Sequence, residues 1–272
     1  MSIIAISRGT FSGGEGLAKR VADRLGYQCV SREANLEEAA KQYDIPVEEL
    51  GVAMERPPSF WERMIGYRAA YLTYIRAALC EQARAGHLVY HGYLGQFLIP
   101  GVSHVIAIRV IADIDFRLRA IMRQQRLTGE EALAYITKVD KDRREWTRFL
   151  FGVDWDLPQH YDLVVNLSRM TLETACETVA GLASRTEFQP THASVQAMEN
   201  LALQARVSAA LAKDFRTADA GFEVTADGGI VTITGTTRWS EINHWAPEVV
   251  RRVSGVKEVR SEIVFVPNFP AG

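Results

Sequence analysis

Short apolar runs alternate with segments of helical periodicity over the first 185 residues of the chain. Runs typical of strands lie at residues 2–7, 27–30, 87–91, 104–110 and 161–167. Helical spacing of apolar positions is found at 14–25, 36–43, 60–85, 113–126 and 172–183. Short buried strands separated by helices form parallel sheets with helices on both faces. This part is therefore predicted to be an α/β domain, which binds ligands at the carboxyl ends of its strands.

The pattern changes near Pro190, which indicates a linker. Beyond it come a helical pattern, two alternating strands joined by Gly228-Gly229, a second helix and a last strand. Strands joined by a glycine turn are typical of a hairpin. We therefore expect an α/β domain at 1–187, a linker at 188–196 and a small α+β domain of order αββαβ at 197–268.

Composition narrows the possible partners. The 272 residues, 47% hydrophobic and 24% charged, are typical of a globular protein with room for two domains. A net charge of −2 gives no general attraction to nucleic acid. The sequence shows neither the basic leader of a signal peptide nor an apolar run of about 20 residues. It therefore does not indicate membrane association or export. The scattered Cys29, Cys80 and Cys176 are interpreted as buried thiols of a cytoplasmic protein, with no metal bound by cysteine.

The most informative feature is a glycine-rich turn between the first strand and the first helix. Free N–H groups of such a turn, together with the dipole of the following helix, attract phosphate. Gly9 and Gly14 fit the two glycines of the motif G-x-x-x-x-G-K-[ST], but Glu15 replaces its lysine and Gly16 its Ser or Thr. The alternative is a tight turn without a ligand, in which Glu15 is a favourable acid in the first helical turn.

Basic residues gather on a predicted helical hairpin between residues 113 and 148. The residues that share one face of its first helix are Arg119, Arg123 and Arg126. Thr128 and Glu131 have the spacing of a capping box, so a second helix is expected to begin there and to carry Arg143. Such a hairpin could close over phosphoryl groups and balance their charge. The alternative is a solvated charged surface.

Three motifs follow one another along this part of the chain. They are Ile4-x-Ile6-Ser7-Arg8 with Ser12-Gly13-Gly14, then Asp140-x-Asp142-Arg143, then Tyr161-Asp162-Leu163-Val164-Val165-Asn166. Over roughly residues 1–185, this order resembles the cytidylate kinase-like family, a branch of the P-loop nucleoside monophosphate kinases. The resemblance implies an ATP site at the glycine turn, a monophosphate site under the helices after the second strand, and an arginine-bearing lid.

The resemblance also assigns candidate site residues. For the ATP site they are Arg8, Gly9, Ser12, Gly13, Gly14, Glu15 and Gly16. For catalysis they are Arg123, Arg143 and Asp142. For the acceptor they are Arg32 and Arg68. His91 is a further candidate for the acceptor because it ends a predicted strand beside the turn, where a neutral imidazole could orient a phosphate or a water. A buried histidine with a structural hydrogen bond is the alternative for His91.

The chain departs from the family pattern where charge is needed. Glu15 and Gly16 remove the phosphate-binding lysine and the hydroxyl that would hold Mg²⁺, and the third strand ends in Tyr90-His91-Gly92-Tyr93 without an acid. One lost charge contact typically costs about 10²–10³ in rate. Mg²⁺ is therefore expected only as a possible cofactor without its usual ligands. Arg8 is a candidate to replace the lysine from the other side of the turn.

The carboxyl-terminal part carries a second resemblance. Val231-Thr232-Ile233-Thr234-Gly235 and Val253-x-Gly255-Val256-x-x-Val259 resemble the BON domain. This resemblance implies an interaction module, with a second copy of the chain or another protein as partner, and it names no catalytic residue.

Three functions remain open from the sequence. The leading one is a nucleotide-binding kinase that transfers phosphoryl from ATP to a nucleoside monophosphate or a related small acceptor. The second is a catalytically silent nucleotide sensor whose closure is transmitted to the BON-like module. The third is a scaffold without a ligand.

Overall fold

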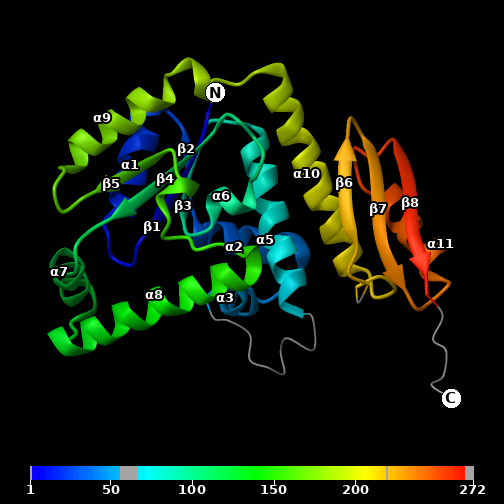
Figure 1. Ribbon diagram of the computed structural model, residues 1–272, viewed down its shortest axis with the longest axis horizontal. Helices are drawn as coiled ribbons and strands as arrows, with labels where there is room; N and C mark the ends of the chain where they lie inside the picture. The colour runs from blue at the N-terminus through cyan, green and yellow to red at the C-terminus, as the bar shows by residue number, and fades with distance from the viewer. Residues whose placement is uncertain (1, 56–66, 219, 267–272) are drawn as a thin grey trace.

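A five-stranded parallel sheet forms the centre of the larger part of the molecule (Figure 1). The computed structural model describes residues 2–55, 67–218 and 220–266. The strand order is β2-β3-β1-β4-β5. Their bounds are Ile3–Arg8 (β1), Gln28–Ser31 (β2), Leu88–Gly92 (β3), Val105–Ile111 (β4) and Leu163–Asn166 (β5). In this order β1 pairs with β3 and β4, so the glycine turn that follows β1 lies near the middle of the carboxyl edge.

Apolar side chains of the strands point alternately to two cores. Ile4 and Ile6 pack with α1 (Gly14–Leu25) and α9 (Leu172–Ala183) on one face. Ile3 packs on the other face, against a larger core. The helices that contribute to this second core are α2 (Arg32–Tyr43), α3 (Val47–Glu55), α5 (Tyr67–Arg84), α6 (Gly95–Leu98), α8 (Gly129–Phe151) and α10 (His192–Lys213). The predicted parallel sheet with helices on both faces is confirmed.

The helical hairpin consists of α7 (Ile114–Gln125) and α8, which lie beyond the carboxyl ends of the central strands (Figure 1). As predicted, a capping box starts α8: the Thr128 side chain accepts from the Glu131 N–H, and Glu131 accepts from the Thr128 N–H at 2.8 Å. Ile121, Ala132 and Ile136 form a small core that holds the two helices together. Short 3₁₀ turns at Pro158–His160 and Thr186–Phe188 flank β5 and α9.

The carboxyl-terminal part has the predicted order of elements. The helix α10 (His192–Lys213) precedes β6 (Glu223–Asp227), β7 (Ile230–Thr237), α11 (Ile242–Arg251) and β8 (Glu258–Phe265). The antiparallel pair β6–β7 and the parallel pair β7–β8 form one sheet. This second sheet shares a core with α10 and α11, to which Val207, Val231 and Val250 contribute fully buried side chains.

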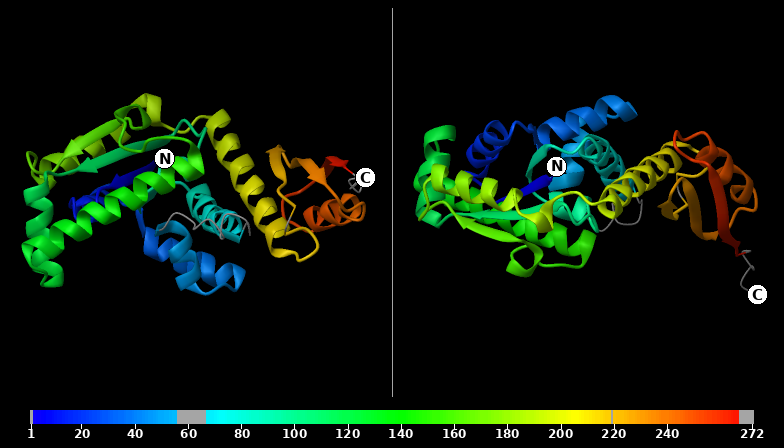
Figure 2. Two further views of the ribbon diagram at one scale, coloured as in Figure 1. Left: turned by 60° about the horizontal axis from the view of Figure 1, so that its bottom comes forward. Right: turned by 90° about the horizontal axis from the view of Figure 1, so that it is seen from above.

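The long helix α10 belongs to both cores and lies between the two sheets (Figures 1 and 2). Met198, Leu201, Ala202, Ala205 and Ala209 pack into the core around α5, whereas Leu203, Val207 and Leu211 pack against the second sheet. Ion pairs reinforce the α5 contact, since Arg84 bonds Glu199 at 2.9 Å. The two parts of the chain are therefore joined through a packed helix.

Several sequence-based boundaries need correction. Residues 192–196, assigned to the linker, are the first turns of α10, because Thr191 and Ser194 form a capping box that the sequence reading missed. The helix α2 begins at Arg32, four residues before the expected start, because the Ser31 side chain caps it. Cys29 is exposed, since β2 is an edge strand, whereas Cys80 and Cys176 are buried as expected. Residues 60–66 of the expected long helix lie outside the described part. No described helix has the length and apolar character needed to cross a bilayer.

Candidate functional site

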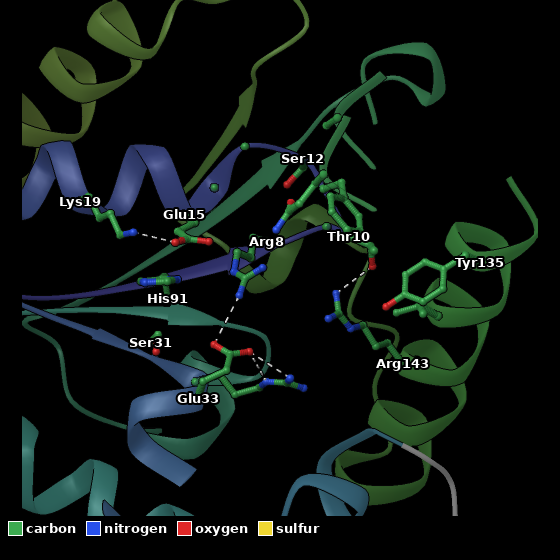
Figure 3. A pocket seen from close by; sticks show the side chains of 18 of the residues that line it. Arg8, Thr10, Ser12, Glu15, Lys19, Ser31, Glu33, His91, Tyr135 and Arg143 are labelled. Carbon is green, nitrogen blue, oxygen red and sulfur yellow. Dashed lines mark hydrogen bonds and ion pairs between the residues drawn. The ribbon is translucent and has the colours of Figure 1, made fainter. Parts of the chain in front are cut away.

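A cavity of about 990 Å³ opens where β1, β2 and β3 end, between the glycine turn and the α7–α8 hairpin. The candidate residues that line it are Arg8, Gly9, Ser12, Gly13, Gly14, Glu15, Arg32, His91, Asp142 and Arg143. Gly16 and Arg123 are not among its lining residues. Arg68 lies in the first turn of α5, where side chains fall outside the described part of the structure. Folding thus brings most of the predicted residues to one place (Figure 3).

Backbone hydrogen bonds fix the conformation of the glycine turn. The Gly9 N–H donates to the Val110 carbonyl at 3.1 Å, and the Ser12 N–H donates to the Gly9 carbonyl at 3.1 Å. Gly13, with φ 84°, takes the left-handed conformation that precedes α1, and no described side chain caps this helix. The N–H groups of the first helical turn therefore stay available to an anion, as at other helix N-termini. A Cβ atom on Gly14 would lie 2.6 Å from the Cβ of Arg8, so this position requires glycine.

Glu15 does not fill the turn with its own carboxylate. Its side chain is half exposed and points along α1 to Lys19, whose Nζ donates to Oε1 at 2.7 Å (Figure 3). This hydrogen bond lowers the pKa of the Glu15 carboxyl. Lys19 itself lines the cavity, one helical turn beyond the place where the motif has its lysine. The spacing of Glu15 and Lys19 could have indicated this pair from the sequence.

Three guanidinium groups converge on the cavity, and one described carboxylate lies between two of them. Glu33 lies 3.6 Å from Arg8 and 3.0 Å from Arg32. Arg143 forms no ion pair with any described carboxylate. Instead, its Nη1 donates to the Thr10 hydroxyl at 3.0 Å, and its guanidinium lies 5.3 Å from the centre of the Tyr93 ring. Burial, followed by the charges of Arg32 and Arg8, lowers the pKa of Arg143 to about 10.

His91 is buried at the end of β3, with 3% of its surface exposed. Burial and the neighbouring charge of Arg8 lower its pKa to about 4, so the imidazole is neutral at physiological pH. The alternative interpretation expected a structural hydrogen bond, but His91 Nδ1 has no hydrogen-bond partner in the described structure. A neutral ring with an unused nitrogen therefore lines the cavity.

Sequence reasoning missed a polar network behind the turn. Arg117 donates to both Asp140 carboxylate oxygens, at 2.9 and 2.7 Å, and its Nε donates to the Thr10 carbonyl at 2.7 Å. The Thr10 hydroxyl donates to the same carboxylate at 3.1 Å. This network attaches the turn to both helices of the hairpin. Ile121, one helical turn beyond Arg117, is fully buried and marks the inner face of α7. An apolar residue at this spacing is the sequence signal that could have identified Arg117 as facing inward.

The arginine stripe on α7 faces solvent. Arg119, Arg123 and Arg126 are exposed, as the charged-surface interpretation expected, and the structure does not bring Arg123 together with Arg143. Asp140 and Arg144 have the i,i+4 spacing of a helical ion pair but do not bind each other, because Asp140 binds Arg117 and Arg144 binds Asp156 at 2.9 Å. Asp142 lines the cavity as predicted, but its carboxylate is paired with Lys138 at 2.6 Å.

The residues at the cavity do not form a site for a divalent metal. Nowhere in the described ranges do three His, Cys, Asp or Glu side chains group in a way that could hold a metal ion. Each described acidic side chain of the cavity is paired with a basic one: Glu15 with Lys19, Glu33 with Arg8 and Arg32, and Asp142 with Lys138. Backbone N–H groups and guanidinium groups bind anions. The arrangement is thus suited to phosphate rather than to Mg²⁺.

The first part of the chain is similar to known proteins. A cytidylate kinase of Ignicoccus hospitalis is 28% identical over 181 residues, which cover 66% of this chain and 97% of that protein. A cytidylate kinase of Pyrococcus horikoshii is 24% identical over 63% of this chain and 82% of its own length. An uncharacterized protein from Eubacterium ventriosum shares the fold, with a TM-score of 0.53 and 19% identity over 68% of this chain and 100% of that structure.

Family models cover both parts of the chain. Residues 200–267 match the BON domain, which includes most of α10 and the whole second sheet. Residues 3–169 match the cytidylate kinase-like family, from β1 into the loop after β5. On this match, and on the sheet and glycine turn that carry it, the chain belongs to the cytidylate kinase-like family and has a BON domain at its carboxyl end.

Proposed function

We propose that the cavity binds the phosphates of a nucleotide and transfers a phosphoryl group from ATP to a nucleoside monophosphate or a related small acceptor. The observation that carries the proposal is the positive charge at Arg143, which forms no ion pair with a described carboxylate and is only partly offset by Asp140. Its guanidinium is opposed by Arg8 and Arg32, and its hydrogen-bond acceptor in the described structure is the neutral Thr10 hydroxyl. A cation held in this way is stabilised by an anion that enters the cavity.

Each wall of the cavity has a separate role in this proposal. The turn Gly13–Gly16 offers N–H groups and the amino end of α1 to the donor phosphates. Arg32 in the first turn of α2 binds the acceptor phosphate, and Arg143 lies between the two on α8. Guanidinium groups aimed at a phosphoryl group in transfer stabilise the charge that spreads over its oxygens. The turn, β2–α2 and the hairpin would then be the donor site, the acceptor site and the lid.

The sensor function remains the second candidate, and two observations favour it. In the described structure the cavity has no lysine in the glycine turn, and the nearest one, Lys19, is bound by Glu15. The helix α10 packs on α5 as well as on the second sheet, so a change around α5 on nucleotide binding would reach the BON domain. A protein that binds a nucleotide tightly without turnover would act as a sensor.

A ligand screen separates the three functions. Thermal unfolding of the full-length protein is followed with nucleoside mono-, di- and triphosphates, and each nucleotide that stabilises it is then tested for phosphoryl transfer by chromatography of the products. The kinase predicts stabilisation and a phosphorylated acceptor. The sensor predicts stabilisation without a product, and the scaffold predicts neither.

A matched pair of variants locates the binding. Arg143→Ala removes one cation of the cavity, whereas Arg119→Ala removes an exposed arginine of the same hairpin that does not line the cavity. Hydrogen bonds to charged groups are worth about 1.5–3 kcal/mol, so Arg143→Ala is expected to weaken nucleotide binding at least about tenfold and Arg119→Ala to leave it unchanged. Equal affinity in both variants would contradict the proposed site.

A further inference from the structure

The way in which this cavity neutralises phosphate can be inferred from its side chains, and the inference rests on the proposed function. P-loop enzymes generally hold Mg²⁺ between the phosphates, a Ser or Thr of the glycine loop and an acid at a strand end. In this chain the loop position is Gly16, and β3 ends at His91-Gly92. Neither position supplies an oxygen ligand from its side chain.

The groups at these positions are unsuited to a hard cation. Mg²⁺ prefers carboxylate, carbonyl and water oxygens in a near-octahedral arrangement. His91 offers a buried nitrogen instead, and Arg8 stands beside it. The nearby carboxylates of Glu15 and Glu33 are engaged by Lys19 and by two arginines. A metal ion bound there would have to displace these cations.

Two arginines line the cavity on opposite sides (Figure 3). Arg8 extends from the end of β1 across Gly14, whose missing side chain makes room for it. Its Nε is buried and has no hydrogen-bond partner in the described structure. Arg143 approaches from the opposite side, on α8 (Figure 3). Repulsion between a divalent cation and fixed guanidinium groups is strong where water is excluded.

We propose that this cavity binds its nucleotide as the metal-free polyanion, with Arg8 and Arg143 neutralising the donor phosphates in place of Mg²⁺. The free nucleotide carries two more negative charges than its magnesium complex, and these charges are directed at the two guanidinium groups. Free ATP is therefore the preferred ligand and the magnesium complex the weaker one.

The test is isothermal titration of the full-length protein with ATP, once in EDTA and once in excess MgCl₂. We expect the dissociation constant to be at least about tenfold lower in EDTA, because hydrogen bonds to charged groups are worth about 1.5–3 kcal/mol each. Equal or tighter binding in MgCl₂ would overturn this inference and leave the proposed function intact. No binding of ATP in either buffer would overturn the proposed function, and this inference with it.

A double variant tests the assignment to these positions. A Cβ on Gly16 would meet Leu172 at 3.6 Å, an ordinary contact, so Gly16→Ser is compatible with the fold. Together with His91→Asp it supplies the hydroxyl and the carboxylate that Mg²⁺ requires. The ratio of the two dissociation constants is expected to shift toward MgCl₂ in this variant. The control, Gly16→Ser with His91→Asn, keeps the size without the charge and should retain the preference of the natural protein.

The same comparison can reject the assignment. Suppose that the natural protein prefers free ATP, but that the variant with His91→Asp and the control with His91→Asn show the same ratio of dissociation constants. These two positions then do not set the preference, and the proposal is wrong in its residues. Circular dichroism of both variants shows whether they are folded, and the ratio is read from two titrations of the same preparation.

Discussion

Arg143 on α8 and Thr10 in the glycine turn are 133 residues apart in the sequence, yet Nη1 of the arginine donates to the threonine hydroxyl at 3.0 Å. The same hydroxyl donates to Asp140 at 3.1 Å. Thr10 therefore positions the basic side chain of the lid without neutralising it. A neutral partner leaves the guanidinium free to exchange its acceptor for a phosphate oxygen.

This relationship predicts a specific role for one hydroxyl. Thr10→Val removes both hydrogen bonds while keeping the shape of the side chain, and Asp140 and Arg143 each lose a partner. We expect a loss of about 1–3 kcal/mol in the free energy of unfolding, measured with urea, together with weaker nucleotide binding. Thr10→Ser keeps the hydroxyl and should remain near the natural protein. Equal losses in the two variants would show that packing, not the hydroxyl, is responsible.

Two glycines of the turn should differ in their tolerance of a side chain. Gly14→Ala places a Cβ 2.6 Å from the Cβ of Arg8, an atom close to the backbone that cannot move aside cheaply. We expect Gly14→Ala to lower the free energy of unfolding by about 1–3 kcal/mol. Gly16→Ala has room and should be neutral or stabilising by about 0.5–1 kcal/mol, since it lies in the first turn of a helix. Urea unfolding of both variants measures these changes. A larger loss of stability for Gly16→Ala than for Gly14→Ala would contradict the geometry of the turn.

His91 should make the stability of the protein depend on pH. Its pKa falls from an ordinary 6.5 to about 4 on folding, so the unfolded chain binds more protons between these values. The contribution of His91 to the free energy of unfolding is therefore fully present above pH 6.5 and is lost as the pH falls toward 4. Between pH 7 and pH 5 this group should lower the free energy of unfolding by about 2 kcal/mol. The check is urea unfolding at both pH values, with His91→Gln as the variant that should lose this part of the dependence. Identical pH dependence in the two proteins would show that His91 is not the group that titrates.

The sequence was sufficient for most of the elements in their order and for most of the cavity, but the helices α3 and α6 were not predicted. Strand and helix patterns, the Thr128 capping box and the glycine turn are local signals, and the structure confirms each of them. The position of the turn at the middle of the carboxyl edge follows from general rules for parallel sheets. Arg8 and His91, at the ends of β1 and β3, could for this reason be expected at one place. Arg32 and Arg143 were expected there because of the resemblance to the family.

The missed residues depend on orientation and on long-range pairing. Three arginines on one face of α7 suggested a lid, but the buried Ile121 shows that the opposite face, with Arg117, points inward. Asp140 and Asp142 lie in the same motif, yet the first joins the turn and the second binds Lys138. The way in which α8 approaches the turn determines the partner of each aspartate. Residue spacing within one segment does not contain that information.

The contact between α5 and α10 should determine whether the two parts unfold together. Ala205, which is 3% exposed, packs into the core around α5, so Ala205→Glu forces a carboxylate into an apolar contact. We expect a loss of at least about 2 kcal/mol and a urea transition that separates into two steps. Ala193→Glu adds the same charge at an exposed position in the first turn of α10 and serves as the control. A single unshifted transition for Ala205→Glu would show that the contact contributes little to folding.

The central claim concerns where the phosphates bind, and a crystal structure of the full-length protein grown with ATP tests it most directly. The account predicts phosphate oxygens within hydrogen-bonding distance of the N–H groups of Gly14 and Glu15 and of the Arg143 guanidinium, with the bond from Arg143 to Thr10 exchanged for one to phosphate. A nucleotide bound elsewhere on the molecule, with the Arg143–Thr10 bond intact and the cavity holding only water, would contradict it.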